Sequence, residues 1–218
     1  MGTRIQNLAN NFTTAGIVKA AAINNASVSG ITSIPAGVGG ALTLLSTQTA
    51  SASASIDFTS GIDSTYDSYV FKFINMHPEL DGGYFYVNFS TDGGSNYNVT
   101  KTTTTFKARH SEDDVTDVLQ YVSGGDLTQE TGNQPIALDG VGNASDESVS
   151  GYLHLFNPSS STYVKHFIIN SNADIGNANC VTSFVAGYCN TTSPINAVRF
   201  IQQSGNLDDG IIKMYGVS

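Results

Sequence analysis

Short runs of β-branched and aromatic residues, separated by turn residues, recur along this chain and limit what it can fold into. Such runs favour strands, and the Gly, Asn, Asp and Ser residues between them favour turns. No stretch after residue 50 has the apolar spacing of a long helix. We therefore predict an all-β protein of about ten short strands, at residues 41–47, 52–58, 68–75, 84–90, 97–106, 115–122, 151–157, 163–170, 181–188, 197–202 and 210–215.

Two pairs of neighbouring runs are predicted hairpins. Residues 91–96 include Gly93 and Gly94, which take positive φ without steric cost, and are expected to join 84–90 to 97–106. The second hairpin pairs 151–157 with 163–170 across a Pro-Ser-Ser-Ser turn. Many short strands at this spacing, the last of them reaching the C-terminus, favour a jelly-roll-like antiparallel β-sandwich.

The first 45 residues differ from the rest, so we divide the chain into an extended N-terminal arm (1–45) and a β-sandwich domain (46–218). The arm is rich in Ala, Asn, Gly, Thr and Ser and has no tyrosine and no acidic residue. Apolar side chains recur along it, as in a segment that lies on another surface, and a disordered tail is the alternative. The expected attachment residues are Ile5, Leu8, Phe12, Ile17, Val18 and Ile23.

Charge is sparse and acidic. Only 12% of residues are charged, and 9 Lys and Arg stand against 18 Asp and Glu, for a net charge of −9. No basic stripe is present for a phosphate backbone, so we do not expect nucleic-acid binding. No run approaches about 18 apolar residues, so we do not expect membrane insertion. A surface poor in Lys and Glu also loses less side-chain entropy when an assembly buries it.

No catalytic constellation is evident, so we predict that the protein is not an enzyme. The nucleophile-elbow pattern G-x-S-x-G is missing, and the acidic groups, such as 112–114 and 208–209, fall in predicted loops. Carboxylates in loops ordinarily keep turns solvated. Calcium is an open alternative there, although the twelve-residue calcium-loop pattern is not found.

Histidine and cysteine do not form a metal-site pattern either, so no metal and no cofactor is expected. His154 and His166 are expected to face each other across the second hairpin as structural residues, because no third ligand is evident. Cys180 and Cys189 lie in what reads as strand–turn–strand or strand–loop–strand. A disulfide is therefore possible, and two reduced, half-buried thiols are the favoured interpretation.

Tyrosine is the remaining functional signal. There are 10 tyrosines and no tryptophan, and tyrosine rings on a rigid sheet can stack on sugars while their hydroxyls form hydrogen bonds. The candidate glycan-facing residues near predicted loop ends are Tyr66, Tyr84, Tyr97 and Tyr121. Packing at strand ends or in subunit contacts is the alternative.

From about residue 46 onward the chain resembles small structural proteins of tailed, mostly marine bacteriophages, which include head-decoration and tail-fibre proteins. The resemblance covers roughly three quarters of the chain and lies in the strings at 47–67, 73–78, 90–97, 151–160 and 212–216. It implies a protein of the virion, assembled in the host cytoplasm, and it carries over no catalytic or binding residue.

We therefore expect a capsid decoration or cement protein, a homotrimer whose arm lies across capsid subunits or neighbouring copies. Its expected partners are itself and the major capsid protein or tail proteins. The alternative is a tail-fibre or receptor-binding module that recognises host surface glycans. A glycan-cleaving enzyme is a third class, and no residue pattern supports it.

Overall fold

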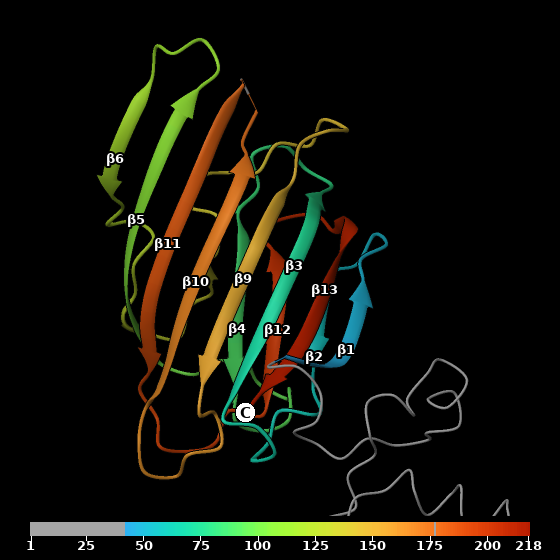
Figure 1. The fold of residues 1–218 in the computed structure, drawn as a ribbon, viewed down its shortest axis with the longest axis vertical. Coiled ribbons are helices and arrows are strands. Elements are labelled where there is room, and N and C mark those ends of the chain that lie inside the picture. The colour runs from blue at the N-terminus through green and yellow to red at the C-terminus, as the bar shows by residue number, and fades with distance from the viewer. Residues whose placement is uncertain (1–41, 177) are drawn as a thin grey trace, which may run out of the picture. The chain divides into compact units, whose positions relative to one another are not determined.

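A computed structural model describes residues 42–176 and 178–218, and within them it contains strands, turns and loops but no helix. The prediction of an all-β protein is therefore confirmed (Figure 1). In the same part of the chain, no helix is long and apolar enough to cross a membrane.

The larger of two antiparallel sheets has nine strands. Eight follow the order β1-β13-β3-β9-β10-β11-β5-β6, and β7 pairs separately with β5. Figure 1 shows this sheet with β6 and β1 at its two edges. The bounds, in sheet order, are β1 (Thr43–Thr49), β13 (Leu207–Val217), β3 (Ser68–Pro78), β9 (Val149–Phe156), β10 (Lys165–Asp174), β11 (Asn179–Cys189), β5 (Lys101–Ser111), β6 (Asp117–Tyr121) and β7 (Thr128–Glu130).

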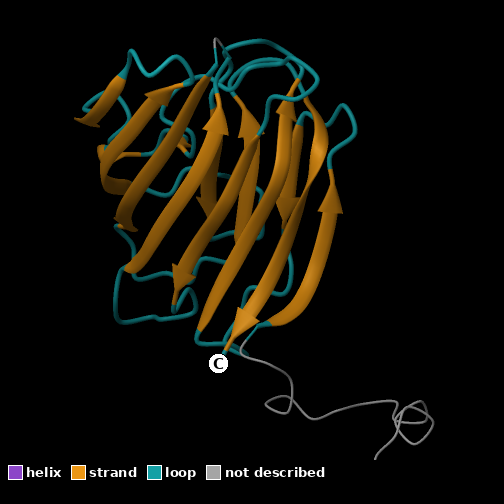
Figure 2. Ribbon diagram, turned by 45° about the horizontal axis from the view of Figure 1, so that its top comes forward, coloured by secondary structure: helices purple, strands orange, loops and turns teal. Residues whose placement is uncertain are grey.

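The smaller sheet packs against one side of the larger one, so the predicted β-sandwich is confirmed (Figure 2). Its order is β2 (Ser55–Phe58), β12 (Ala197–Gln202), β4 (Phe85–Ser90) and β8 (Gln134–Pro135). Phe200 of β12 joins the two sheets, because its ring centroid lies 6.2 Å from that of Phe58, 5.8 Å from Phe71, 6.4 Å from Phe73 and 5.9 Å from Phe85. Such aromatic clusters bury large apolar areas at favourable edge and offset geometries.

The segment after β8 also packs on the larger sheet. Ile136 and Leu138 are buried there. The Ser171 hydroxyl of β10 donates to the Ile136 carbonyl (2.8 Å), and the Leu138 N–H donates to Ser183 Oγ of β11 (3.0 Å). One side of β10 and β11 is thus buried beneath this segment.

The predicted hairpin of 84–90 with 97–106 is wrong. β4 pairs with β12 and β8 in the small sheet, whereas β5 pairs with β11, β6 and β7 in the large sheet. The turn itself forms as predicted, with Gly93 at φ 71° and Gly94 at φ 89°, but it begins a crossing from one sheet to the other. Both runs alternate as half-buried strands do, and alternation does not specify a partner. The hairpin of β9 with β10 is confirmed.

Other differences concern strand limits and connectivity. β3 continues to Pro78, beyond the predicted end at residue 75, and the short strands β7 and β8 were not predicted. β1 begins at Thr43 and so crosses the expected boundary between arm and sandwich. These strand orders do not establish the jelly-roll connectivity. Residues 1–41 of the predicted arm lie outside the described residues.

A bulge between β3 and β13 requires glycine. The register shifts between Asp209 and Ile211, and Gly210 there has φ +122°, a conformation that side chains disfavour. A Cβ at this position would lie only 2.7 Å from the Asn75 carbonyl oxygen.

Candidate interaction surface

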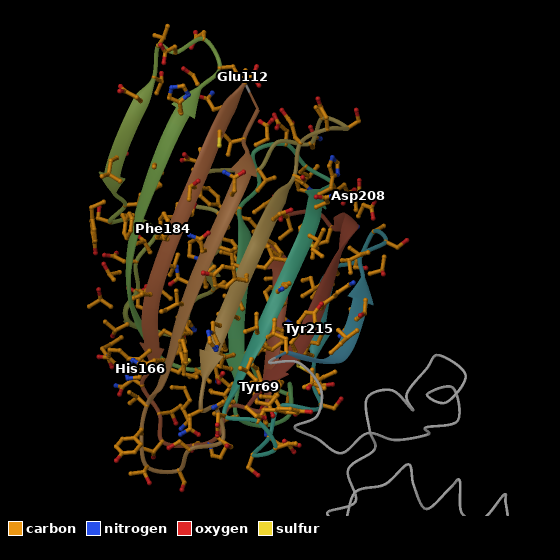
Figure 3. All side chains as sticks on the ribbon, viewed as in Figure 1. Tyr69, Glu112, His166, Phe184, Asp208 and Tyr215 are labelled. Carbon is orange, nitrogen blue, oxygen red and sulfur yellow. The ribbon has the colours of Figure 1, made fainter. Side chains whose placement is uncertain are left out.

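The larger sheet has a second side that the small sheet does not cover. Along β10, Phe167 and Ile169 are buried in the core, whereas the alternate residues His166 and Ile168 are exposed on the opposite side. Figure 3 looks onto this opposite side and labels His166, Phe184 and Tyr215.

We call this side of the larger sheet the outer face and define it by strand register. Its members are Leu44, Thr47, Thr49, Val70, Lys72, Ile74, Thr102, Thr104, Phe106, Ala108, Leu119, Tyr121, Ser150, Tyr152, His154, Phe156, His166, Ile168, Asn170, Asn172, Thr182, Phe184, Ala186, Tyr188, Ile211, Lys213 and Tyr215. Its edge is the register that joins Asp117, His110, Cys180 and Asp174.

Three aromatic residues lie in one register across β6, β5 and β11. Tyr121 is paired with Phe106, and Phe106 with Phe184. The two phenylalanine rings stack with centroids 4.8 Å apart and planes 12° apart. Even so, Tyr121, Phe106 and Phe184 remain 54%, 42% and 36% exposed. Cross-strand aromatic pairs stabilise a sheet, but this pair leaves much of its apolar area in water.

An open, largely apolar groove lies beside this register. Residues of β9, β10 and β11 line it, among them Phe156, His166, Ile168 and Tyr188. Ile168 is 45% exposed. Together, the groove and the aromatic register form an apolar patch that extends from β6 to β9, of the kind that marks a contact surface in soluble proteins.

The charged side chains on this side of the sheet are two lysines and, at the edge register, two carboxylates. Lys72 of β3 and Lys213 of β13 are the basic members of the outer face, and the carboxylates of Asp117 of β6 and Asp174 of β10 lie in the register at its edge. The two lysines are direct cross-strand partners, and Lys72 Nζ lies 5.3 Å from the Tyr215 ring centroid. In the described part of the chain neither forms an ion pair. Like charges in this position repel, so a carboxylate on a bound partner would relieve a repulsion.

His154 and His166 both lie on the outer face, but they are not cross-strand partners, so the prediction that they face each other is wrong. His154 pairs with Ile168, and His166 pairs with Tyr188, so the two rings lie in different registers. The His154 Nε2 is 2.9 Å from Ser68 Oγ, and its ring lies 4.0 Å from that of Phe156. Burial lowers the pKa of His154, which keeps the ring neutral at neutral pH.

The four candidate glycan-facing tyrosines lie apart. Tyr66 packs edge-on against Tyr69 (5.9 Å between centroids), and Tyr84 stacks on Tyr86 beside the small sheet (6.1 Å, 14°). Tyr97 lies under the Arg199 guanidinium, 4.0 Å from ring centroid to Cζ. Tyr121 alone of the four belongs to the outer face, and its hydroxyl donates to Asp126.

The two cysteines are both free and occupy a single strand, β11, so the strand–turn–strand interpretation is wrong. Cys180 is exposed and Cys189 is buried. At about 3.3 Å per residue, an extended strand holds them too far apart for a disulfide. Among residues 42–176 and 178–218, no three His, Cys, Asp or Glu side chains gather as metal ligands.

Most of the outer face was not predicted, although the sequence carries a signal for it. β10 and β11 carry apolar residues at consecutive positions, as in Phe167-Ile168-Ile169 and Phe184-Val185-Ala186. A sandwich strand with one wet side normally alternates apolar with polar residues, so consecutive apolar residues indicate that both sides are apolar. The predicted attachment residues Ile5 to Ile23 lie outside the described residues.

Comparison of the chain with models of known protein families finds no match, and comparisons with curated proteins and with solved structures find none either.

Proposed function

We propose that this chain is a non-enzymatic structural protein of a bacteriophage virion and that its outer face packs against neighbouring protein subunits. The observation that carries the proposal is the exposed apolar patch from β6 to β9, centred on the stacked Phe106 and Phe184. The resemblance of residues 46–218 to phage structural proteins supports the choice of a virion.

The patch is suited to repeated, weak contacts. Full burial of a large apolar side chain contributes about 1.5–3 kcal/mol. Side chains such as Ile168, Phe106 and Tyr152, which are 45%, 42% and 42% exposed, retain less than half of that gain for a partner. Each then contributes about 1 kcal/mol. One contact is modest, and many copies on a regular particle add through multivalency.

Within this proposal the protein is a capsid decoration or cement protein, forms a homotrimer and attaches through residues 1–45 to the major capsid protein. The anchors in that segment are Ile5, Leu8, Phe12, Ile17, Val18 and Ile23, each of which gains free energy by leaving water. The outer face then supplies lateral contacts between sandwiches or with the capsid surface.

Quantitative mass spectrometry of purified particles tests the proposal. We expect the chain in proportion to the major capsid protein, and we expect a variant that lacks residues 1–40 to fold but not to join particles. Absence of the chain from purified virions contradicts the proposal. A copy number typical of a tail, far below that of the capsid protein, contradicts the decoration role alone.

One observation favours the second candidate, a glycan-binding receptor module. The stacked pair Tyr84 and Tyr86 lines a pocket with Val122, Pro135 and Leu138, which offers ring faces next to apolar walls. Sugar rings stack on such faces. Binding on a glycan array that is lost in Tyr84→Ala and retained in Phe184→Thr supports this candidate, and no binding to any glycan contradicts it.

A further inference from the structure

Two fully buried lysines lie on either side of a buried cysteine. Lys101 of β5 and Lys165 of β10 are both paired in register with Cys189 of β11, and each is 0% exposed. Their ammonium groups end among different partners. Lys165 Nζ donates to the carbonyls of Tyr163 and Thr191, both at 3.1 Å.

Lys101 instead reaches a side-chain amide. Its Nζ donates to the Val99 carbonyl (2.7 Å) and to Oδ1 of Asn88 (2.7 Å), with the Thr131 carbonyl at 3.5 Å. Asn88 belongs to β4 in the small sheet and is 2% exposed. The pairing of β4 with β8 covers only Tyr86 and Val87, so it ends one residue before Asn88. Lys101 reaches Asn88 there from the larger sheet.

The surroundings of Lys101 favour the free amine. No carboxylate of the described residues bonds to it, and burial lowers its pKa to about 8. Burial also raises the pKa of Cys189 to about 12, so the neighbouring thiol is uncharged and does not act as a counter-ion. About a tenth of the Lys101 side chains are then unprotonated at pH 7, which makes the amine an available nucleophile.

The Asn88 amide is held with its carbonyl oxygen toward two donors. Oδ1 accepts from the Phe89 N–H (2.9 Å) as well as from Lys101, and Nδ2 donates to the Thr131 carbonyl (3.1 Å) and to Asn133 Oδ1 (2.9 Å). If Oδ1 and Nδ2 of Asn88 were exchanged, the amide N–H groups would face the Phe89 N–H and the Lys101 ammonium group, which are both donors. The four hydrogen bonds therefore fix the orientation of the amide. The Phe89 N–H polarises the carbonyl in the way that an oxyanion-hole donor does.

We propose that Lys101 and Asn88 form an intramolecular isopeptide bond that joins the two sheets covalently. The unprotonated Nζ attacks Cγ of Asn88, and the Phe89 N–H stabilises the oxyanion of the tetrahedral intermediate. The Cγ–Nδ2 bond then breaks, and Nδ2 leaves as ammonia with the proton that Nζ releases. A lysine amine and an asparagine carboxamide thus become a secondary amide and ammonia, and no oxidant, metal or nucleotide takes part.

The bond is independent of the proposed function. It links β5 of the large sheet to β4 of the small sheet, where backbone pairing to β8 has ended. Separation of the sheets along this edge then requires the breaking of a covalent bond, which resists mechanical or thermal opening of the sandwich.

Denaturing mass spectrometry of the purified full-length protein, followed by tryptic mapping, tests the proposal. We expect an intact mass lower by one molecule of ammonia, no cleavage after Lys101 and a branched peptide that joins Lys101 to Asn88. Any unreacted fraction decreases faster at pH 9 than at pH 6, because the attack uses the free amine. Lys101→Arg and Asn88→Ala should each keep the full mass. Lys165→Arg is the matched control, because the Lys165 ammonium group bonds only to backbone carbonyls. The Lys165→Arg protein should still lose one molecule of ammonia.

The wild-type protein decides the question even where a variant fails to fold. Full mass with cleavage after Lys101, persisting after incubation at pH 9, overturns the proposal. If the protein loses ammonia but trypsin still cleaves after Lys101, a succinimide has formed elsewhere and the proposal is overturned. Deamidation of Asn88 without a branched peptide overturns the proposal as well.

Discussion

Replacing both Phe106 and Phe184 by threonine removes the stacked pair at the centre of the outer face. Threonine is β-branched, so it suits a strand as phenylalanine does. The exposed remainders of the two rings are 42% and 36%, so their burial by a partner contributes about 1–2 kcal/mol in total at about 1.5–3 kcal/mol for each full burial. We therefore expect particle binding to weaken by about 5- to 30-fold.

Folding should survive this change. Loss of the ring stacking and of the covered part of each ring lowers the free energy of unfolding by about 2–4 kcal/mol, while the core around Phe200 is untouched. Denaturant unfolding measures that loss.

Co-sedimentation of purified variant with particles that lack the protein measures binding. Tyr163→Thr is the matched control, because Tyr163 is 70% exposed in the loop between β9 and β10 and does not belong to the outer face. It should bind as the wild type does. If the double variant is folded and also binds with wild-type affinity, the outer face is not the contact surface.

Three further predictions concern the sandwich itself. Gly210→Ala places a side chain at φ +122° against a backbone carbonyl, and we expect guanidinium unfolding to show a loss of about 1–3 kcal/mol, whereas an unchanged midpoint contradicts the strain at the bulge. Arg199→Lys removes the two hydrogen bonds to the Asp57 carboxylate (2.8 and 2.6 Å) and the stacking over Tyr97. Urea unfolding should show that the free energy of unfolding falls by about 1 kcal/mol, and Arg199→Ala should lower it further. Hydrogen bonds from Asn96 and Ser90 lower the pKa of Asp92 from 3.8 to about 2, so its contribution is present above pH 3.8 and is lost as pH falls toward about 2. Asp92→Asn should flatten that part of the acid-unfolding profile, and a profile of unchanged slope there refutes this role.

Much of the secondary structure follows from local sequence. The strand predicted at 197–202 coincides with β12, and the hairpin of β9 with β10 follows from two alternating runs around a proline-serine turn. The positive φ of Gly93 and Gly94 is likewise a local property, because only glycine adopts it without cost.

Residue pattern by itself determined that this chain forms strands, where most of them lie and which side chains share a side of each. Tertiary structure alone decided the partners: that β4 and β5 belong to different sheets, that Cys180 and Cys189 share one strand, and that Lys101 meets Asn88. The physical reason is that a period of two specifies two sides of a strand but neither which side is buried nor which strand lies beside it. Those choices depend on long-range register and on how the aromatic side chains of two sheets fill one core.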